Sequence, residues 1–192
     1  MQAPLRAIQR EIDRLTGITE EYLRLARLPA PRLEPEDLGE VVTEVARFVD
    51  REMKSAGCTV ELRIDPALPL VAVDESQIRQ ALLNLLRNAR EAMPHGGEIT
   101  VSATRAPGGV EIEVRDRGEG IPPERKEKLF DLFHSTKERG TGLGLPLTQQ
   151  IVVAHRGVIR CEDAPGGGTV FRMTFPSTDV DPGAEDAGDR AA

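Results

Sequence analysis

Residues 75–93 have the sequence ESQIRQALLNLLRNAREAM, and this stretch decides the fold. Its apolar side chains recur at steps of three and four, which predicts one amphipathic helix from Glu75 to Met93. The apolar arc of that helix consists of Ile78, Leu82, Leu85, Leu86, Ala89 and Met93. The opposite side consists of Asn84, Arg87, Asn88 and Glu91. The helix therefore needs a second layer to cover one face and leaves a polar face for water or a ligand.

Two asparagines on the polar face make this helix unusual. Asn84 and Asn88 are four residues apart, so their amides lie on neighbouring turns. A solvated surface is one interpretation. The other is a metal site, because asparagine is a mediocre helix former and an amide oxygen is a hard neutral ligand that can join phosphate oxygens around Mg²⁺.

A short acidic and glycine-rich segment follows an alternating strand. It is Asp116-Arg117-Gly118-Glu119-Gly120-Ile121-Pro122. Glycines two apart permit positive φ and close approach of the backbone, and a carboxylate at a strand end can accept a hydrogen bond from an exocyclic amine. An ordinary β-turn is the alternative interpretation.

A second glycine-rich segment opens a helix. It is Gly140-Thr141-Gly142-Leu143-Gly144-Leu145. Backbone N–H groups that enter a helix start can bind an anion, whereas a flexible hinge is the alternative. The segment is neither a P-loop nor a dinucleotide-binding fingerprint, because no Gly-Lys-Ser/Thr follows and no strand leads tightly into it.

The remaining pattern predicts an α+β fold, a two-layer sandwich of a mixed sheet under helices. Residues 5–28 have an apolar stripe typical of one long N-terminal helix, and prolines in 29–36 predict a stiff linker. Asp37 is the expected N-cap of a helix that ends near Gly57 and buries Val41, Val45 and Phe48. Strands are expected at 60–64, 99–101, 110–114, 159–161 and 170–175, with a helix ending near Gly157.

Composition narrows the functional class. The 192 residues are 39% hydrophobic and 30% charged, typical of a globular protein, and no apolar run reaches a membrane span. The net charge of −7 argues against nucleic-acid binding. Residues 177–192 are acidic and almost without large apolar side chains, so we expect a disordered tail. Cys58 and Cys161 have no metal-type spacing, so half-buried, reduced strand thiols and a cytoplasmic location are expected.

Four motifs in order resemble bacterial two-component sensor histidine kinases. They are Asn84-Leu85-Leu86-Arg87-Asn88-Ala89, Asp116-x-Gly-x-Gly, Phe130-Asp131-Leu132-Phe133 and Gly140-Thr141-Gly142-Leu143-Gly144-Leu145, which resemble the N, first-glycine, F and second-glycine boxes. Gly166-Gly167-Gly168-Thr169 is similar to the last glycine turn of that family. The resemblance spans 37–176 as a catalytic ATP-binding domain and implies the gyrase, histidine-kinase and MutL ATPase fold.

The resemblance assigns site residues. Asp116 would bind the adenine amine, with Gly118 and Gly120 against the base. Asn88 would be the principal Mg²⁺ ligand, and Asn84 a second phosphate or metal-water contact. Relatives of the gyrase type have a glutamate at the position of Asn84 as general base, so asparagine implies slow hydrolysis. Further nucleotide contacts implied are Thr136, Gly140, Thr141, Gly142, Leu143, Gly144 and Thr169. Cations near the γ-phosphate would be Arg87, Lys137 and Arg139.

The segment between Phe133 and Gly140 is a short lid, which resembles the nitrogen-regulation branch of the family. A histidine on a dimerisation helix is the acceptor in such kinases, and none of His95, His134 and His155 has the expected sequence context. Residues 1–28 resemble the second helix of the dimerisation hairpin, with the first helix absent. We therefore expect no self-phosphorylation, and the simplest inference is a fragment that begins after the acceptor helix.

The leading hypothesis is a protein-histidine kinase catalytic domain that binds ATP and Mg²⁺. Its expected partners are the phosphoacceptor helix of the intact kinase and, indirectly, a response regulator receiver domain. The stripe on residues 5–28 predicts a weak homodimer, and no contact with a membrane or with nucleic acid is expected. Two alternatives stay open: a nucleotide-dependent binding module, anti-sigma-factor-like or a degenerate kinase, and a hydrolytic ATPase, which Asn84 disfavours.

Overall fold

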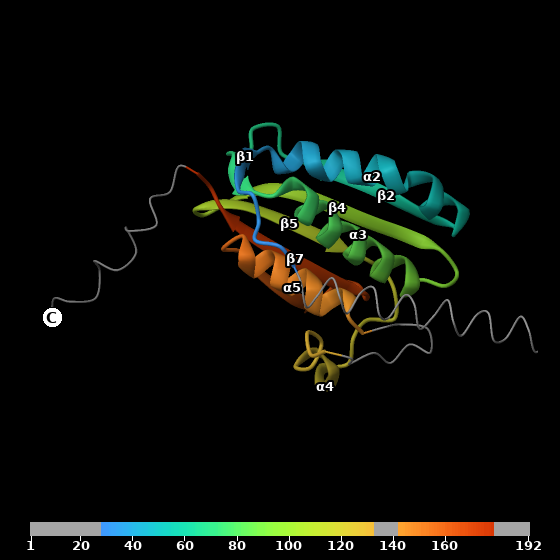
Figure 1. Cartoon of the computed structure of the whole chain (residues 1–192). Helices are drawn as coiled ribbons and strands as arrows, with labels where there is room; N and C mark the ends of the chain where they lie inside the picture. Colours follow the sequence, from blue (N-terminus) through green and yellow to red (C-terminus); the bar gives the residue numbers. More distant parts are fainter. Residues whose placement is uncertain (1–27, 133–141, 179–192) are drawn as a thin grey trace, which may run out of the picture.

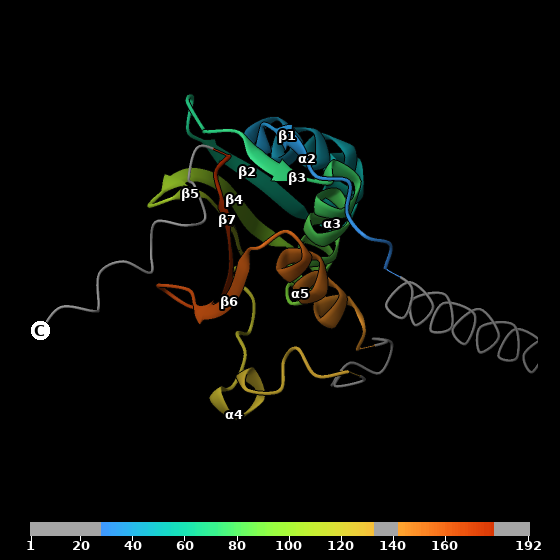
Figure 2. The same ribbon diagram turned by 60° about the vertical axis from the view of Figure 1, so that its left-hand side comes forward.

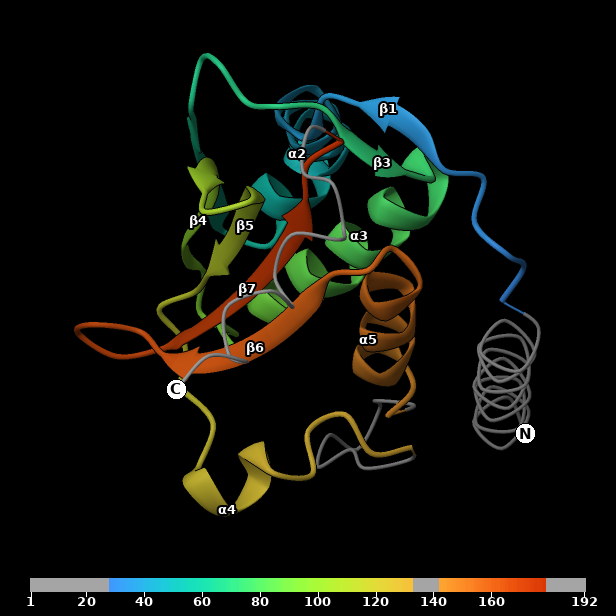
Figure 3. The ribbon, with the colours of Figure 1, turned by 90° about the vertical axis from the view of Figure 1, so that its left-hand side faces the viewer.

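The computed structural model describes residues 28–132 and 142–178. Helices α2 (Leu38–Ser55), α3 (Glu75–Glu91) and α5 (Gly144–Ala154) cover one face of a five-stranded sheet, and no described helix covers the other face (Figures 1 and 3). The fourth described helix is the short α4 (Pro123–Lys126). The strands are β1 (Glu34–Glu36), β2 (Cys58–Ile64), β3 (Val71–Val73), β4 (Gly97–Ala106), β5 (Gly109–Arg115), β6 (Val158–Asp163) and β7 (Thr169–Pro176). The predicted helix up to residue 27, the whole segment between Phe133 and Gly140, and nearly all of the acidic tail lie outside the described residues.

The sheet is mixed, as its sequence pattern predicted. The strand order is β2-β4-β5-β7-β6, with β2 and β4 parallel and every other neighbouring pair antiparallel. Strands β4, β5 and β7 alternate buried and partly exposed residues, so one side faces the helices and the other is polar. On the polar side, Arg172 of β7 forms ion pairs with Glu111, Glu113 and Glu162.

Helix α3 lies between α2 and α5 and forms the middle of the helical layer (Figure 1). Asp74 caps it by accepting a hydrogen bond from the backbone N–H of Gln77 at 3.2 Å. The hydrogen bond from the Ser76 hydroxyl holds the pKa of Asp74 below its ordinary value, and hydrogen bonds from backbone N–H groups make smaller contributions. The predicted apolar arc is buried throughout, from Ile78 to Met93, so the polar arc remains for other contacts.

Three features differ from the sequence prediction. Residues 34–36, expected in a linker, form β1 and pair with β3, a short strand that the sequence pattern did not indicate. Phe48, expected in the buried stripe of α2, has 75% of its surface exposed, because it lies one position outside the arc that Val45 and Val49 define. The segment after Pro122 contains the short helix α4, which lies apart from the other helices (Figure 2).

Candidate functional site

Asp116 stands where β5 ends and lies at the centre of a backbone-bonded loop. Its side chain is 3% exposed, and its Oδ1 atom accepts hydrogen bonds from the N–H groups of Gly118 at 2.8 Å and Thr169 at 3.2 Å. The N–H of Asp116 donates in turn to the carbonyl of Thr169 at 2.9 Å. These contacts fix a buried acceptor at the end of the sheet, where a hydrogen-bond donor of a ligand can meet it.

The glycine turn between β6 and β7 packs directly against the backbone of Asp116. Gly168 has a φ of +96°, and a Cβ atom there would lie 2.1 Å from the carbonyl oxygen of Asp116. Only glycine therefore allows the turn to approach the Asp116 loop this closely. Thr169, the next residue, is also buried and begins β7. The turn at 166–169 therefore requires glycine at position 168 for steric reasons.

The end of α3 abuts the same loop. A Cβ atom on Gly118 would lie 2.6 Å from the carbonyl oxygen of Ala92, the C-cap of α3. Gly120 has a φ of +75°, and a Cβ atom there would meet the carbonyl oxygen of Gly168 at an ordinary contact distance of 3.6 Å, so its requirement for glycine is conformational. The polar face of α3 is consequently closest to the Asp116 loop at the C-terminal end of the helix and extends from there towards its N-terminus.

Asn84, two turns before Ala92, contacts the start of α5. Its Nδ2 atom donates to the carbonyl of Gly144 at 3.2 Å and lies 3.4 Å from Oγ1 of Thr148. The rise of an α-helix places these two contact points of α3 about 12 Å apart. One face of α3 therefore connects the Asp116 loop with the second glycine segment.

Asn88 lies between those two contact points. It is partly exposed, and within the described residues its side chain makes no hydrogen bond. Arg87 is exposed and, over the same residues, forms no ion pair. Leu143 is buried and Gly142 has a φ of +69°, so the described end of the second glycine segment already has the sharp backbone of a loop entering a helix. Thr136, Lys137, Arg139, Gly140 and Thr141 lie outside the described residues.

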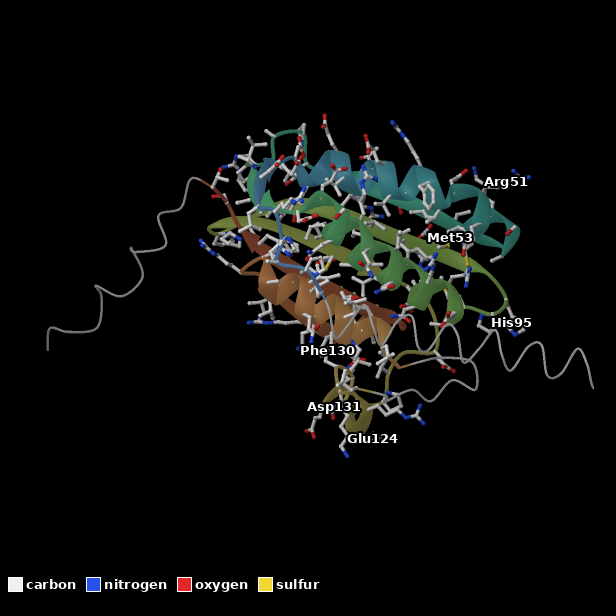
Figure 4. The ribbon with its side chains drawn as sticks, in the orientation of Figure 1. Arg51, Met53, His95, Glu124, Phe130 and Asp131 are labelled. Carbon is white, nitrogen blue, oxygen red and sulfur yellow. The ribbon has the colours of Figure 1, made fainter. Side chains whose placement is uncertain are left out.

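The segment with α4 follows the Asp116 loop in the chain and contacts the edge of the sheet. Phe130 is partly buried against the core and lies on the α5 side of α4, whereas Glu124 and Asp131 are exposed (Figure 4). Lys126 of α4 forms an ion pair with Asp163 of β6 at 2.7 Å. This contact ties α4 to the edge strand beside Asp116.

The two described histidines do not take part in this arrangement. His155 is buried; its Nδ1 atom donates to the carbonyl of Ile151 at 2.7 Å and its Nε2 atom accepts from the N–H of Asp74 at 3.0 Å. The carbonyl of Ile151 can only accept, so the hydrogen of the imidazole lies on Nδ1. The N–H of Asp74 can only donate, so Nε2 carries no hydrogen. His95 lies in the exposed turn after α3, at the far end of the molecule from β1 (Figure 4). His134 lies outside the described residues.

Both cysteines are free, as expected from their spacing. Cys58 is wholly buried rather than half-buried, because it begins β2 beneath α2. Cys161 is partly buried on β6, and this burial raises the pKa of its thiol to about 11. The charges of Asp163, Asp116 and Glu162 add to the increase, while that of Lys126 opposes it.

Three neighbours of the site were missed from the sequence: Ala92, Thr148 and Cys161. Only Thr148 had a usable signal, since it follows Gly144 by four residues and therefore lies one helical turn beyond it. No described group of three or more acidic, histidine or cysteine side chains could hold a metal ion. Among the described helices, none has the length and apolarity needed to cross a membrane.

The structure is thus an α+β domain with a candidate ligand site between a buried acid at a strand end and the polar face of a helix. Residues 73–179 match the family described as histidine kinase-, DNA gyrase B- and HSP90-like ATPase. Sensor histidine kinase ZraS of Klebsiella oxytoca is 37% identical over 168 residues, which are 87% of this chain and 36% of that protein. Sporulation kinase C of Bacillus subtilis is 33% identical over 167 residues, 86% of this chain and 39% of that protein. The chain thus spans less than two fifths of these relatives.

Solved structures give the same result. The catalytic domain of histidine kinase ThkA has a TM-score of 0.70 and 32% identity, with 76% of this chain and 95% of that chain covered. Full-length ShkA in complex with AMPPNP has a TM-score of 0.78 at 28% identity, covering 91% of this chain and 38% of ShkA. ThkA in complex with the response regulator TrrA has a TM-score of 0.77 at 29% identity, covering 90% of this chain and 50% of the ThkA chain. The chain belongs to the histidine kinase-, DNA gyrase B- and HSP90-like ATPase family, as the catalytic domain of a sensor histidine kinase.

Proposed function

We propose that this chain binds ATP with Mg²⁺ and transfers the γ-phosphoryl group to a histidine on the dimerisation helix of a sensor kinase. The observation that supports this most is the convergence of Asp116, the polar face of α3 and the start of α5 on one side of the sheet. The likeness to ShkA, whose structure contains AMPPNP, agrees with an ATP analogue as ligand.

The adenine end of the proposed site is the Asp116 loop. The carboxylate would accept a hydrogen bond from the adenine 6-amino group, while Gly118 and Gly120 leave the backbone accessible to the base. Thr169 holds the carboxylate through its backbone N–H and borders the same end of the site. A buried acceptor of this kind discriminates against a purine that has a carbonyl in place of the amine.

The phosphate end would be formed by Asn84, Asn88 and the glycines that lead into α5. Asn88 fits Mg²⁺ because its amide is partly exposed and makes no hydrogen bond within the described residues. When bound, Mg²⁺ would neutralise charge on the β- and γ-phosphates. Gly140, Thr141, Gly142, Leu143 and Gly144 would surround the phosphates, with Thr136, Arg87 and Lys137 near them.

The side chain of Asn84 is the feature that favours transfer over hydrolysis. Its amide nitrogen donates to Gly144, and a carboxamide takes no proton at neutral pH. The side chain of Asn84 could therefore not activate water as a general base, so the γ-phosphoryl group would be kept for the acceptor histidine.

The acceptor is proposed to lie on another chain. His155 is buried with both ring nitrogens bonded, and His95 lies in the exposed turn after α3. His134 lies outside the described residues, and none of the three histidines has the sequence context of an acceptor. We therefore infer that the chain does not phosphorylate itself. Residues 1–28, as a second dimerisation helix, would contact the acceptor helix and support a weak homodimer.

A response regulator receiver domain is proposed as the indirect partner, by analogy with ThkA, which has been solved in complex with TrrA. We also propose a cytoplasmic location and membership of the nitrogen-regulation branch. The branch assignment rests on the short segment His134–Arg139, which lies outside the described residues.

The decisive experiment supplies a separate acceptor. The chain is mixed with radiolabelled ATP·Mg²⁺ and a full-length kinase that is inactive but retains its histidine. Label on that histidine, and none on the chain alone, is the expected result. ATP binding without transfer would instead favour a nucleotide-dependent binding module, and rapid release of phosphate would favour a hydrolytic ATPase.

Replacement of Asn88 by alanine tests the metal site. We expect the affinity for ATP in the presence of Mg²⁺ to fall at least about tenfold, while binding in EDTA stays unchanged. The fold should persist, because Asn88 lies outside the buried arc of α3. Titration calorimetry with and without Mg²⁺ measures both affinities. Equal loss under both conditions would contradict a metal role.

Replacement of Asp116 by asparagine tests the adenine site. An amide at this position has one acceptor oxygen in place of two, so we expect the preference for ATP over GTP to fall at least about tenfold. Competition of GTP against a fluorescent ATP analogue measures the preference. A variant that keeps the preference of the wild type would remove Asp116 from base recognition.

A further inference from the structure

Thr148 has a hydroxyl group that the proposed mechanism does not use. The residue is completely buried in α5, and its Oγ1 atom donates to the carbonyl of Gly144 at 2.9 Å. That bond uses the only proton of the hydroxyl, so its oxygen can act towards other groups only as an acceptor. The nearest such group is the Nδ2 atom of Asn84, at 3.4 Å.

The two acceptors on α5 determine which way the amide of Asn84 points. The carbonyl oxygen of Gly144 lies 3.2 Å from Nδ2, and the hydroxyl oxygen of Thr148 lies on the same side. An amide turned the other way would place its Oδ1 atom against two oxygens that have no proton to offer it. The nitrogen must therefore face α5, and Oδ1 lies on the opposite side of the amide group.

We infer that Thr148 is a positioning residue: it holds the carboxamide of Asn84 so that Oδ1 is presented away from α5, to a water bound to the metal or to another donor at the phosphates. This inference rests on the proposed function and deepens it. It assigns the orientation of the first asparagine of α3 to a threonine of another helix. Thr148 itself contacts neither nucleotide nor metal in this arrangement.

A bond from threonine to the carbonyl four residues earlier is common in helices, so a purely structural role has to be separated from a positioning role. The chain provides a matched control. Oγ1 of Thr43 donates to the carbonyl of Gly39 at 2.8 Å in α2, with the same sequence separation. Among the described residues no asparagine is hydrogen-bonded to Thr43, which lies on α2, whereas Asn84 and Thr148 lie on α3 and α5.

The test uses the full chain with the variants Thr148→Val, Thr148→Ser and Thr43→Val. Calorimetry gives the affinity for ATP with Mg²⁺ and with EDTA, and the ratio of the two is the metal enhancement. We expect Thr148→Val to lower this ratio about tenfold, the size typical of groups that orient a metal site. Thr148→Ser should retain it, and Thr43→Val should leave it unchanged. Should Thr148→Val not fold, as judged by circular dichroism, Thr148→Ala takes its place.

A double variant locates the effect. In an Asn84→Ala background, Thr148→Val should lower the metal enhancement no further, because the amide that it orients is gone. The inference fails if Thr148→Val behaves like Thr43→Val, if it weakens binding equally with and without Mg²⁺, or if its effect persists without Asn84. A wild-type chain whose ATP affinity does not depend on Mg²⁺ would overturn the proposed function itself, before any variant is compared.

Discussion

Individual hydrogen bonds of Asp116 explain how two distant parts of the sequence form one end of the site. A single oxygen, Oδ1, accepts from Gly118 in its own loop and from Thr169 at the start of β7. The carboxylate is thus fixed from two directions before any ligand arrives. Such preorganisation reduces the entropy lost on binding.

Cys161, close to that carboxylate, provides a prediction about pH. Burial raises the pKa of its thiol from 9.0 to about 11. Between these values the unfolded chain releases a proton that the folded chain retains, so the stability that Cys161 contributes should be complete below about pH 9 and lost as the pH rises towards 11. The free energy of unfolding of Cys161→Ser should lack this decline. Urea denaturation of both proteins from pH 7 to 11 measures it, and a difference that stays constant with pH would exclude the effect.

At the scale of elements, the turn between β6 and β7 determines how closely two loops approach. Gly166 and Gly168 both have positive φ, but a Cβ atom on Gly166 would meet no atom within 4 Å. Substitution of either by alanine should cost roughly 1–3 kcal/mol of backbone strain. Only Gly168→Ala also displaces Asp116, so only this variant should lose ATP affinity, at least about tenfold.

Thermal unfolding and calorimetry together check that comparison. Gly166→Ala is the matched control, since it has the same backbone requirement in the same turn. If both variants bound ATP with the affinity of the wild type, the close approach of the turn would be irrelevant to the site. If both lost affinity equally, general strain rather than the contact with Asp116 would be the cause.

Helices and strands with a regular spacing of apolar residues could be predicted from the sequence. Elements that form only because they pair with one distant segment could not. Helix α3 and strands β4, β5 and β7 have apolar residues at steps that only one secondary structure satisfies. Strand β3 has three residues, and its role depends on pairing with β1, which no local pattern indicates. Phe48 was misplaced for a similar reason, because the width of a buried arc depends on the element that covers it.

The site was predictable to a similar degree. Asp116, Asn84 and the glycine turn were evident as motifs, and the structure brings the described ones to one side of the sheet. The contact of Ala92 with Gly118 and that of Thr148 with Asn84 arise from packing between helices and loops far apart in sequence. Single-sequence reasoning has no signal for such pairs unless a spacing within one helix happens to reveal them.

At the scale of the whole molecule, residues 28–36 belong to the folded domain rather than to a free linker. Leu28 packs against the core, and the side chain of Gln77 donates to the carbonyl of Pro29 at 3.0 Å. The N–H of Arg32 donates to the carboxylate of Asp74 at 3.1 Å, and β1 then pairs with β3 beside the start of α3 (Figure 2). The direction in which the chain enters the domain is consequently set by α3, the same helix that bears Asn84 and Asn88.

Truncation tests this attachment. A chain that starts at residue 37 loses the partner strand of β3, the hydrogen bond from Gln77 to Pro29 and that from Arg32 to Asp74, whereas one that starts at residue 28 keeps them. We expect the shorter chain to be less stable by roughly 1–3 kcal/mol, the net contribution of two such hydrogen bonds. Urea denaturation of the two truncated chains measures the difference. Equal denaturation midpoints would mean that 28–36 only connects the domain to the preceding segment, and that α3 does not determine the direction of entry.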